Sequence, residues 1–116
     1  MRAVVVHQFG PAETLKVEDF PAPQPGVGEV LIDIYAIGLN FSDRLMMEGK
    51  YQVRPERPFV PGRDVCGVVA KVGAGVTRCQ PGDRVLSVLP FGAYAEQAIS
   101  PQNRCWVIPD RLDFID

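Results

Sequence analysis

Apolar and polar residues alternate along several short stretches of this 116-residue chain. The clearest alternation lies at 29–37, and it predicts a β-strand that buries one face. The apolar face of this strand consists of Val30, Ile32, Ile34 and Ala36.

Further strands are predicted where runs of β-branched and apolar residues are bounded by glycine or proline. They cover 2–8, 15–20, 65–72, 84–89, 93–100 and 104–108. In 65–72 the face expected to enter the core consists of Cys66, Val68, Ala70 and Val72. The chain holds eleven Gly and eleven Pro, so it reverses often. The pattern therefore predicts a mainly β fold, either a small barrel or a sandwich.

Two short helices are expected between and after these strands. The first runs from Phe41 to about Glu48, with Asn40 as its N-cap and Gly49 as its stop. The second begins at Arg111 and is capped by Asp110.

Composition excludes several classes of protein. The net charge of −2 and the lack of a basic run argue against nucleic-acid binding. No apolar run is long enough to span a membrane, and the start of the chain shows no signal-peptide pattern. The three cysteines include no C-x-x-C pair. They indicate reduced thiols in a cytoplasmic protein.

Six motifs occur in an order and spacing that identify a family. They are Gly38-Leu39-Asn40, Gly49-Lys50-Tyr51, Pro61-Gly62-Arg63-Asp64-Val65-Cys66-Gly67-Val68-Val69, Val72-Gly73-Ala74-Gly75-Val76, Pro81-Gly82-Asp83-Arg84-Val85 and Gly92-Ala93-Tyr94-Ala95-Glu96. Residues 1–110 resemble the N-terminal, GroES-like domain of the medium-chain dehydrogenase/reductase superfamily. Within it they are most similar to the zinc-free NADPH:quinone oxidoreductase branch. The resemblance implies a partly open β-barrel of short strands with one or two short helices.

The resemblance also implies a larger enzyme of which this chain is the substrate-side domain. Such an enzyme transfers hydride from NADPH to a quinone or an α,β-unsaturated carbonyl, and it is expected to be a homo-oligomer. The chain contains no G-x-G-x-x-G motif, so residues 111–116 are expected to begin a connection to a missing Rossmann nucleotide-binding domain. By itself the chain is expected to be inactive. The alternative is a stand-alone GroES-like barrel that acts as a binding or assembly module.

Two positions argue against a catalytic zinc ion. Zinc-dependent members of the superfamily carry Gly-x-Cys-His-x-Asp and Gly-His-Glu, where this chain has Asn40 and Arg63 at the ligand positions. Neither an amide nor a guanidinium is a usual zinc ligand. We therefore expect no zinc.

Three residues are candidates for the site. The resemblance implies that Asn40 faces both nicotinamide and substrate, although it is also suited to capping the helix alone. Tyr51 matches a cleft tyrosine that holds a substrate oxygen or a ribose hydroxyl, or it packs at a loop edge. Arg63 either binds the nucleotide phosphate or an acidic substrate, or it pairs with Asp64. Leu45 stands where many relatives carry a second tyrosine.

Two other residues are predicted to be structural. Tyr94 lies in an apolar stretch, which favours a place in the barrel core. His7 is the only histidine, and the sequence around it offers no catalytic partner.

Overall fold

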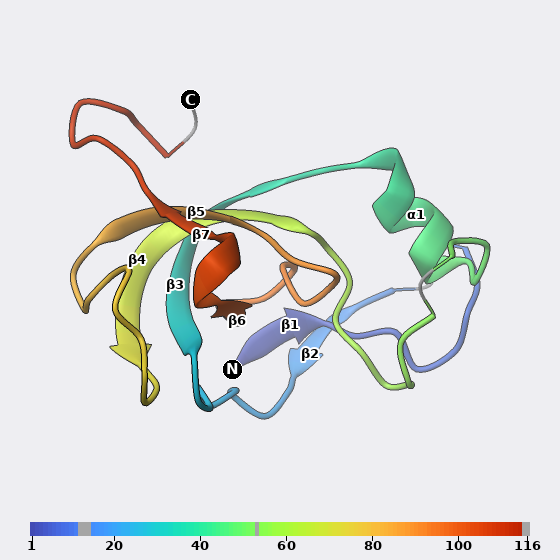
Figure 1. Ribbon diagram of the computed structural model, residues 1–116. Coiled ribbons are helices and arrows are strands. Elements are labelled where there is room, and N and C mark those ends of the chain that lie inside the picture. The colour runs from blue at the N-terminus through green and yellow to red at the C-terminus, as the bar shows by residue number, and fades with distance from the viewer. Residues whose placement is uncertain (12–14, 53, 115–116) are drawn as a thin grey trace.

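A five-stranded antiparallel sheet forms the body of the molecule in the computed structural model, which describes residues 1–11, 15–52 and 54–114. Its strands are β3 (Glu29–Gly38), β4 (Asp64–Val72), β5 (Arg84–Val88), β6 (Gln97–Pro101) and β7 (Cys105–Val107). They lie in the order β6-β3-β4-β5-β7. The sheet curls strongly along its length (Figure 1).

A small two-stranded sheet lies against the open side of the curled sheet (Figure 1). It consists of β1 (Arg2–Val4) and β2 (Val17–Asp19). Single β-bridges join Ala3 to Ala95 and Val6 to Phe59. The predicted strand 2–8 is therefore too long, because the backbone of Val6 pairs with the loop before β4 instead of with β2. The resulting mainly β, partly open barrel confirms the predicted fold class.

The first predicted helix is present as α1 (Phe41–Met47), and the 3-10 helix η2 (Gln102–Arg104) precedes β7. The predicted helix after Asp110 does not form, because residues 110–114 make turns. The Arg84 guanidinium explains this difference, since it donates to the carbonyl oxygens of Pro109 and Leu112. Ile115, the last apolar residue of that prediction, lies outside the described residues.

The core-facing residues of β3 were predicted correctly where the strand is most buried, because Val30 and Ile32 are fully shielded from solvent. In β4 the prediction was wrong. The buried face consists of Val65, Gly67 and Val69, whereas Cys66, Val68 and Ala70 are half-buried. Both faces of β4 are apolar, so alternation could not identify the inner one. A bulge opposite the Leu31–Ile32 step then returns Val72 to the core.

Most other predicted strands and the first helix end within two residues of the observed bounds. The exception is 93–100, which becomes β6 at Gln97–Pro101. The backbone N–H groups of Ala93 and Tyr94 donate instead to the carbonyl oxygens of Gly62 and Pro61. This arrangement places Tyr94 against three apolar clusters that the described residues form. None of the described helices is long and apolar enough to cross a membrane.

Candidate functional site

The end of β3 and the start of β4 bring Asn40 next to Asp64. Gly38 pairs with Asp64 in the sheet, and a Cβ atom on Gly38 would lie 3.1 Å from the Cβ of Asp64. Glycine therefore lets the two strand ends approach closely here. Asn40 follows in an extended conformation as the N-cap of α1. Its Nδ2 donates a hydrogen bond to Asp64 Oδ2 at 3.0 Å.

Asp43 is the buried centre of this site. It is 1% exposed, and its Oδ2 accepts hydrogen bonds from the backbone N–H of Asn40 at 3.0 Å and from the Tyr94 hydroxyl at 2.9 Å. The other oxygen, Oδ1, is also buried and has no hydrogen-bond partner among the described residues. Asp43 thus ties the start of α1 to Tyr94, 51 residues away in the sequence.

Tyr94 lies in the core, as predicted, and it also has a polar role. Burial is the main reason that its pKa is raised well above the ordinary value for tyrosine, and the hydrogen bond and the charge of Asp43 act in the same direction. The neutral phenol is therefore retained as the donor to Asp43. We call Asn40, Asp43, Asp64 and Tyr94 the α1 network.

Tyr51 and Arg63 form a second pair beside this network. Arg63 Nη1 donates to the Tyr51 hydroxyl at 3.2 Å, and Arg63 Nε donates to the Leu89 carbonyl oxygen at 3.2 Å. The alternative of an Arg63–Asp64 ion pair is wrong, since Asp64 accepts from Asn40 and no such pair occurs within the described parts of the chain. Arg63, which donates to Tyr51, directly precedes Asp64, which accepts from Asn40. The three candidate residues are therefore linked through two neighbouring residues of the chain.

Several features of the site were missed from the sequence. Leu39 and Phe41 flank Asn40 and are 79% and 74% exposed, which is unusual for side chains of this size. Nothing in the sequence signalled this exposure, because large apolar residues beside an N-cap commonly pack against their own helix or the core. A shallow recess also borders Asp64, and its lining includes Ile37, Gly38, Cys66 and Leu86.

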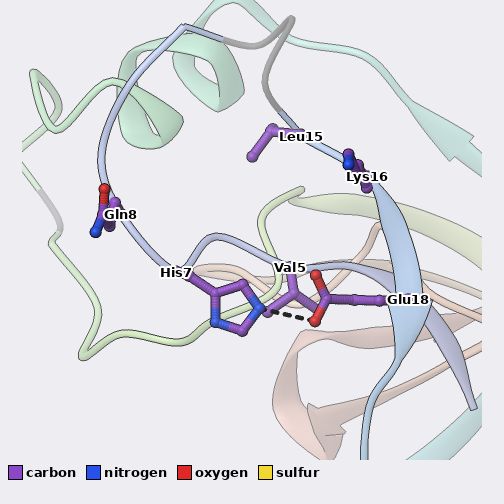
Figure 2. Close-up of a pocket in the computed structure, with 6 residues that line it drawn as sticks. All are labelled: Val5, His7, Gln8, Leu15, Lys16 and Glu18. Atoms are coloured by element: carbon purple, nitrogen blue, oxygen red, sulfur yellow. Dashed lines mark hydrogen bonds and ion pairs between the residues drawn. The ribbon is translucent and has the colours of Figure 1, made fainter.

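A separate recess lies near β1 and β2 and contains His7 (Figure 2). His7 Nε2 lies 2.7 Å from Glu18 Oε1, so the histidine does have a carboxylate partner that the sequence did not reveal. The described residues that line the recess include no Ser, Thr or Cys that could act as a nucleophile. They are Val5, His7, Gln8, Leu15, Lys16 and Glu18. The histidine–carboxylate pair therefore fits the predicted structural role of His7.

No group of three or more His, Cys, Asp or Glu residues in the described ranges is arranged to hold a metal ion. The side chains of the α1 network offer hydrogen-bond donors and acceptors. Asn40 Nδ2 carries two N–H groups, of which Asp64 fixes one, and the exposed apolar side chains beside it can contact a flat apolar molecule.

Comparison with known proteins agrees with this architecture. Residues 26–110 match the family model of the alcohol dehydrogenase GroES-like domain. A quinone oxidoreductase-like protein 2 homolog of Nematostella vectensis is 43% identical over 115 residues, which are 97% of this chain and 31% of that protein. The quinone oxidoreductase of Rattus norvegicus is 40% identical over 116 residues, covering 98% of this chain and 35% of the relative. The chain thus spans about a third of the length of these relatives.

Solved structures give the same result. The Escherichia coli quinone oxidoreductase complexed with NADPH is 30% identical with a TM-score of 0.92, and the match covers 98% of this chain and 35% of that one. A Pseudomonas syringae quinone oxidoreductase is 35% identical with a TM-score of 0.92, covering 97% and 35%. The resemblance to quinone oxidoreductases is therefore confirmed, and the chain belongs to the alcohol dehydrogenase GroES-like domain family.

Proposed function

We propose that this chain is the substrate-side domain of an NADPH-dependent reductase of quinones or α,β-unsaturated carbonyls. The proposal rests on Asn40, whose amide is held by Asp64 at an exposed helix start between two exposed apolar side chains. The similarity to quinone oxidoreductases, one of them solved with NADPH, supports this reading of the site.

The residues of the α1 network fit a nicotinamide nucleotide and a carbonyl acceptor. The second N–H of Asn40 Nδ2 suits a carbonyl oxygen, and Leu39 and Phe41 suit a flat ring. The N–H groups of Arg63 that are not used by Tyr51 and Leu89 suit an anionic group such as a nucleotide phosphate. NADPH, when bound, supplies the hydride.

In this proposal the protein contributes orientation and hydrogen bonds. Asp64 accepts one N–H of the Asn40 amide, so the amide loses little freedom when it donates the other to a substrate oxygen. A donor fixed in advance stabilises negative charge that develops on that oxygen. Arg63 holds the Tyr51 hydroxyl, and we assign this hydroxyl the role of a second substrate contact.

Replacing Asn40 tests the proposal, in a protein that carries these residues together with a nucleotide-binding domain. Asn40→Ala removes both the amide and the cap, whereas Asn40→Ser keeps a good helix cap and replaces the amide with a shorter hydroxyl. This hydroxyl has one O–H, so it cannot donate to Asp64 and to a substrate at the same time. Loss of the second N–H should lower kcat/KM on the order of a hundredfold in both variants. If Asn40 serves only as a cap, Asn40→Ser will have the kcat/KM of the unaltered protein.

The 116-residue chain alone separates this function from the alternative of a stand-alone binding module. We expect it to fold and to show no quinone reduction, because it has no G-x-G-x-x-G turn to hold the nucleotide phosphates. NADPH titration by calorimetry, with quinone turnover followed in parallel, is the measurement. Micromolar NADPH binding or steady turnover would contradict the proposal that a separate domain binds the nucleotide.

We also propose that the site works without zinc. Asn40 replaces one expected ligand, and the guanidinium of Arg63 replaces another with a positive charge that is already bonded to Tyr51 and Leu89. Stoichiometric zinc that remains after dialysis against a mild chelator would contradict this.

A further inference from the structure

The segment that follows β1 and the loop that follows α1 lie side by side (Figure 1). The backbone joins them, because Val6 pairs with Phe59 and the Gly10 N–H donates to the Met47 carbonyl oxygen. Residues of both segments line a recess of about 700 Å³, which we call the arginine recess. Its lining consists of His7, Phe9, Arg54, Pro55, Glu56 and Arg57.

Aromatic packing holds one arginine of this recess in place. The Arg57 guanidinium lies over the Phe9 ring, 4.7 Å from the ring centroid. Phe9 packs in turn on the buried Phe59, with 6.1 Å between the two ring centroids. Gly49 lies so close to Phe9 that a Cβ atom there would be 2.8 Å from Phe9 Cγ. A guanidinium positioned in this way loses less freedom when its N–H groups bind a ligand.

The protein does not balance the charges of the two arginines. Both Arg54 and Arg57 are exposed, and in the described ranges neither guanidinium forms an ion pair or a hydrogen bond. At the end of α1, by contrast, Glu48 pairs with both Arg44 and Lys50. Glu56 lines the arginine recess and offsets one of its two guanidinium charges, so the recess keeps a net positive charge.

We propose that Arg54 and Arg57 bind a phosphate group in the arginine recess. The N–H groups of a guanidinium lie in one plane and can donate to two phosphate oxygens together. Arg57 supplies this oriented pair of donors, and Arg54 supplies a second positive charge. A phosphate carries up to about two negative charges at neutral pH, which suits two cations better than the single charge of a carboxylate.

The ligand is either inorganic phosphate or a small phosphate ester. Phe9 and Pro55 are half-buried in the lining and offer an apolar wall that the organic part of an ester can contact. The proposal does not rest on the proposed reductase function, because Asn40, Tyr51 and Arg63 do not line this recess.

The test is an NMR titration of the 116-residue chain that follows the side-chain Nε–H signals of its arginines. Inorganic phosphate and phenyl phosphate are the probes, and acetate at the same ionic strength is the control. We expect both phosphates to shift the Arg54 and Arg57 signals saturably and to leave that of Arg111, an exposed arginine outside the recess, unchanged. Tighter binding of phenyl phosphate would identify an ester as the ligand, and equal binding would identify free phosphate. Equal shifts with acetate, or at Arg111, would overturn the proposal.

Variants of matched charge separate a built site from general attraction to a positive surface. Arg57→Gln should weaken phosphate binding about tenfold, because it removes charge-assisted hydrogen bonds. Arg111→Gln removes the same charge elsewhere and should leave binding unchanged. Glu56→Gln should strengthen binding about threefold, since it removes the one negative charge of the recess.

Phe9→Leu tests the orientation of Arg57 without changing any charge. It removes the ring beneath the guanidinium and should weaken binding by less than Arg57→Gln does. Arg57→Lys keeps the charge and loses the planar pair of donors, so it should weaken binding in the same direction. Equal weakening by Arg57→Gln and Arg111→Gln, or full binding by Arg57→Lys together with Phe9→Leu, would overturn the proposed site.

Discussion

Ile32 and Asp43 are shielded from solvent to nearly the same degree, but their surroundings differ completely. Ile32 lies on β3 among apolar side chains of the sheet core. Asp43 lies on α1, where one carboxylate oxygen accepts two hydrogen bonds and the other accepts none from the described residues. Burial of Ile32 is itself the stabilising term. Burial of Asp43 costs free energy that its two donors offset only in part, and such costs are characteristic of functional sites.

The core should give the largest effect on stability. Ile32→Ala removes a fully buried side chain from a packed cluster, and we expect it to lower the free energy of unfolding by about 4 kcal/mol. Ile37→Ala is the matched control, because it makes the same change on the same strand at a side chain that is 40% exposed. It should cost less than about 1 kcal/mol. Urea unfolding of both variants is the measurement, and equal losses would contradict the assigned inner face of β3.

Asp43→Ala should have the second-largest effect and lower the free energy of unfolding by about 2–3 kcal/mol. The change leaves the Tyr94 hydroxyl and the Asn40 backbone N–H without their acceptor, and each unsatisfied group costs about 1–3 kcal/mol. It also removes Oδ1, a buried oxygen with no hydrogen-bond partner in the described part of the chain, and this gain keeps the loss of stability below that of Ile32→Ala. Asp110→Ala, at an exposed aspartate, is the control.

A double-mutant cycle separates the contribution of the Asp43–Tyr94 hydrogen bond from the other causes of the lower unfolding free energy. With Tyr94→Phe as the second change, the coupling energy should be about 1 kcal/mol. Additive losses would mean that the Tyr94 hydroxyl contributes nothing to holding Asp43.

The contrast between core and network also explains what could be predicted from the sequence. Alternation identified Val30 and Ile32 because Glu29 and Asp33 mark the other face of β3, although Leu31 on that face is buried as well. It failed for β4, where Cys66 and Val65 are both apolar and only the bulge and the pairing with β3 decide the inner face. Local pattern predicts a strand, and it predicts the face only where the two faces differ in polarity.

The α1 network depended even less on local pattern. Asn40 was predicted as a cap from its neighbours in the sequence, and as a candidate site residue from the family resemblance. Its hydrogen bond to Asp64, and the bond between Asp43 and Tyr94, join segments 24 and 51 residues apart. Pairing with the neighbouring Asp64 was one alternative for Arg63, which instead donates to Tyr51. Such partners are set by the tertiary fold.

The α1 network should also make the stability of the fold decrease with rising pH in the alkaline range. The pKa of Tyr94 is raised in the folded chain, so the folded state favours the neutral phenol. The contribution of this group is therefore fully present below the ordinary tyrosine pKa of about 10 and is lost as the pH rises above it. The melting temperature should fall more steeply above about pH 10 in the unaltered chain than in Tyr94→Phe. Parallel curves for the two proteins would show that Tyr94 ionises as readily when folded as when unfolded.

The smallest effect is expected at the His7–Glu18 pair, which resembles the α1 network in its hydrogen bonding but not in its burial. The atoms are 2.7 Å apart, yet the side chains are 58% and 38% exposed. Water solvates both groups when the pair is broken, and dissolved salt screens their attraction when it is formed. We therefore expect a coupling energy of at most about 0.5 kcal/mol in a cycle of His7→Ala and Glu18→Ala, and less at high salt. Urea unfolding at low and high salt measures it, with the Asp43–Tyr94 cycle as reference. A coupling energy as large as that of Asp43 and Tyr94 would contradict this expectation. It would mean that the distance between two polar partners, rather than their burial, sets the coupling energy in this molecule.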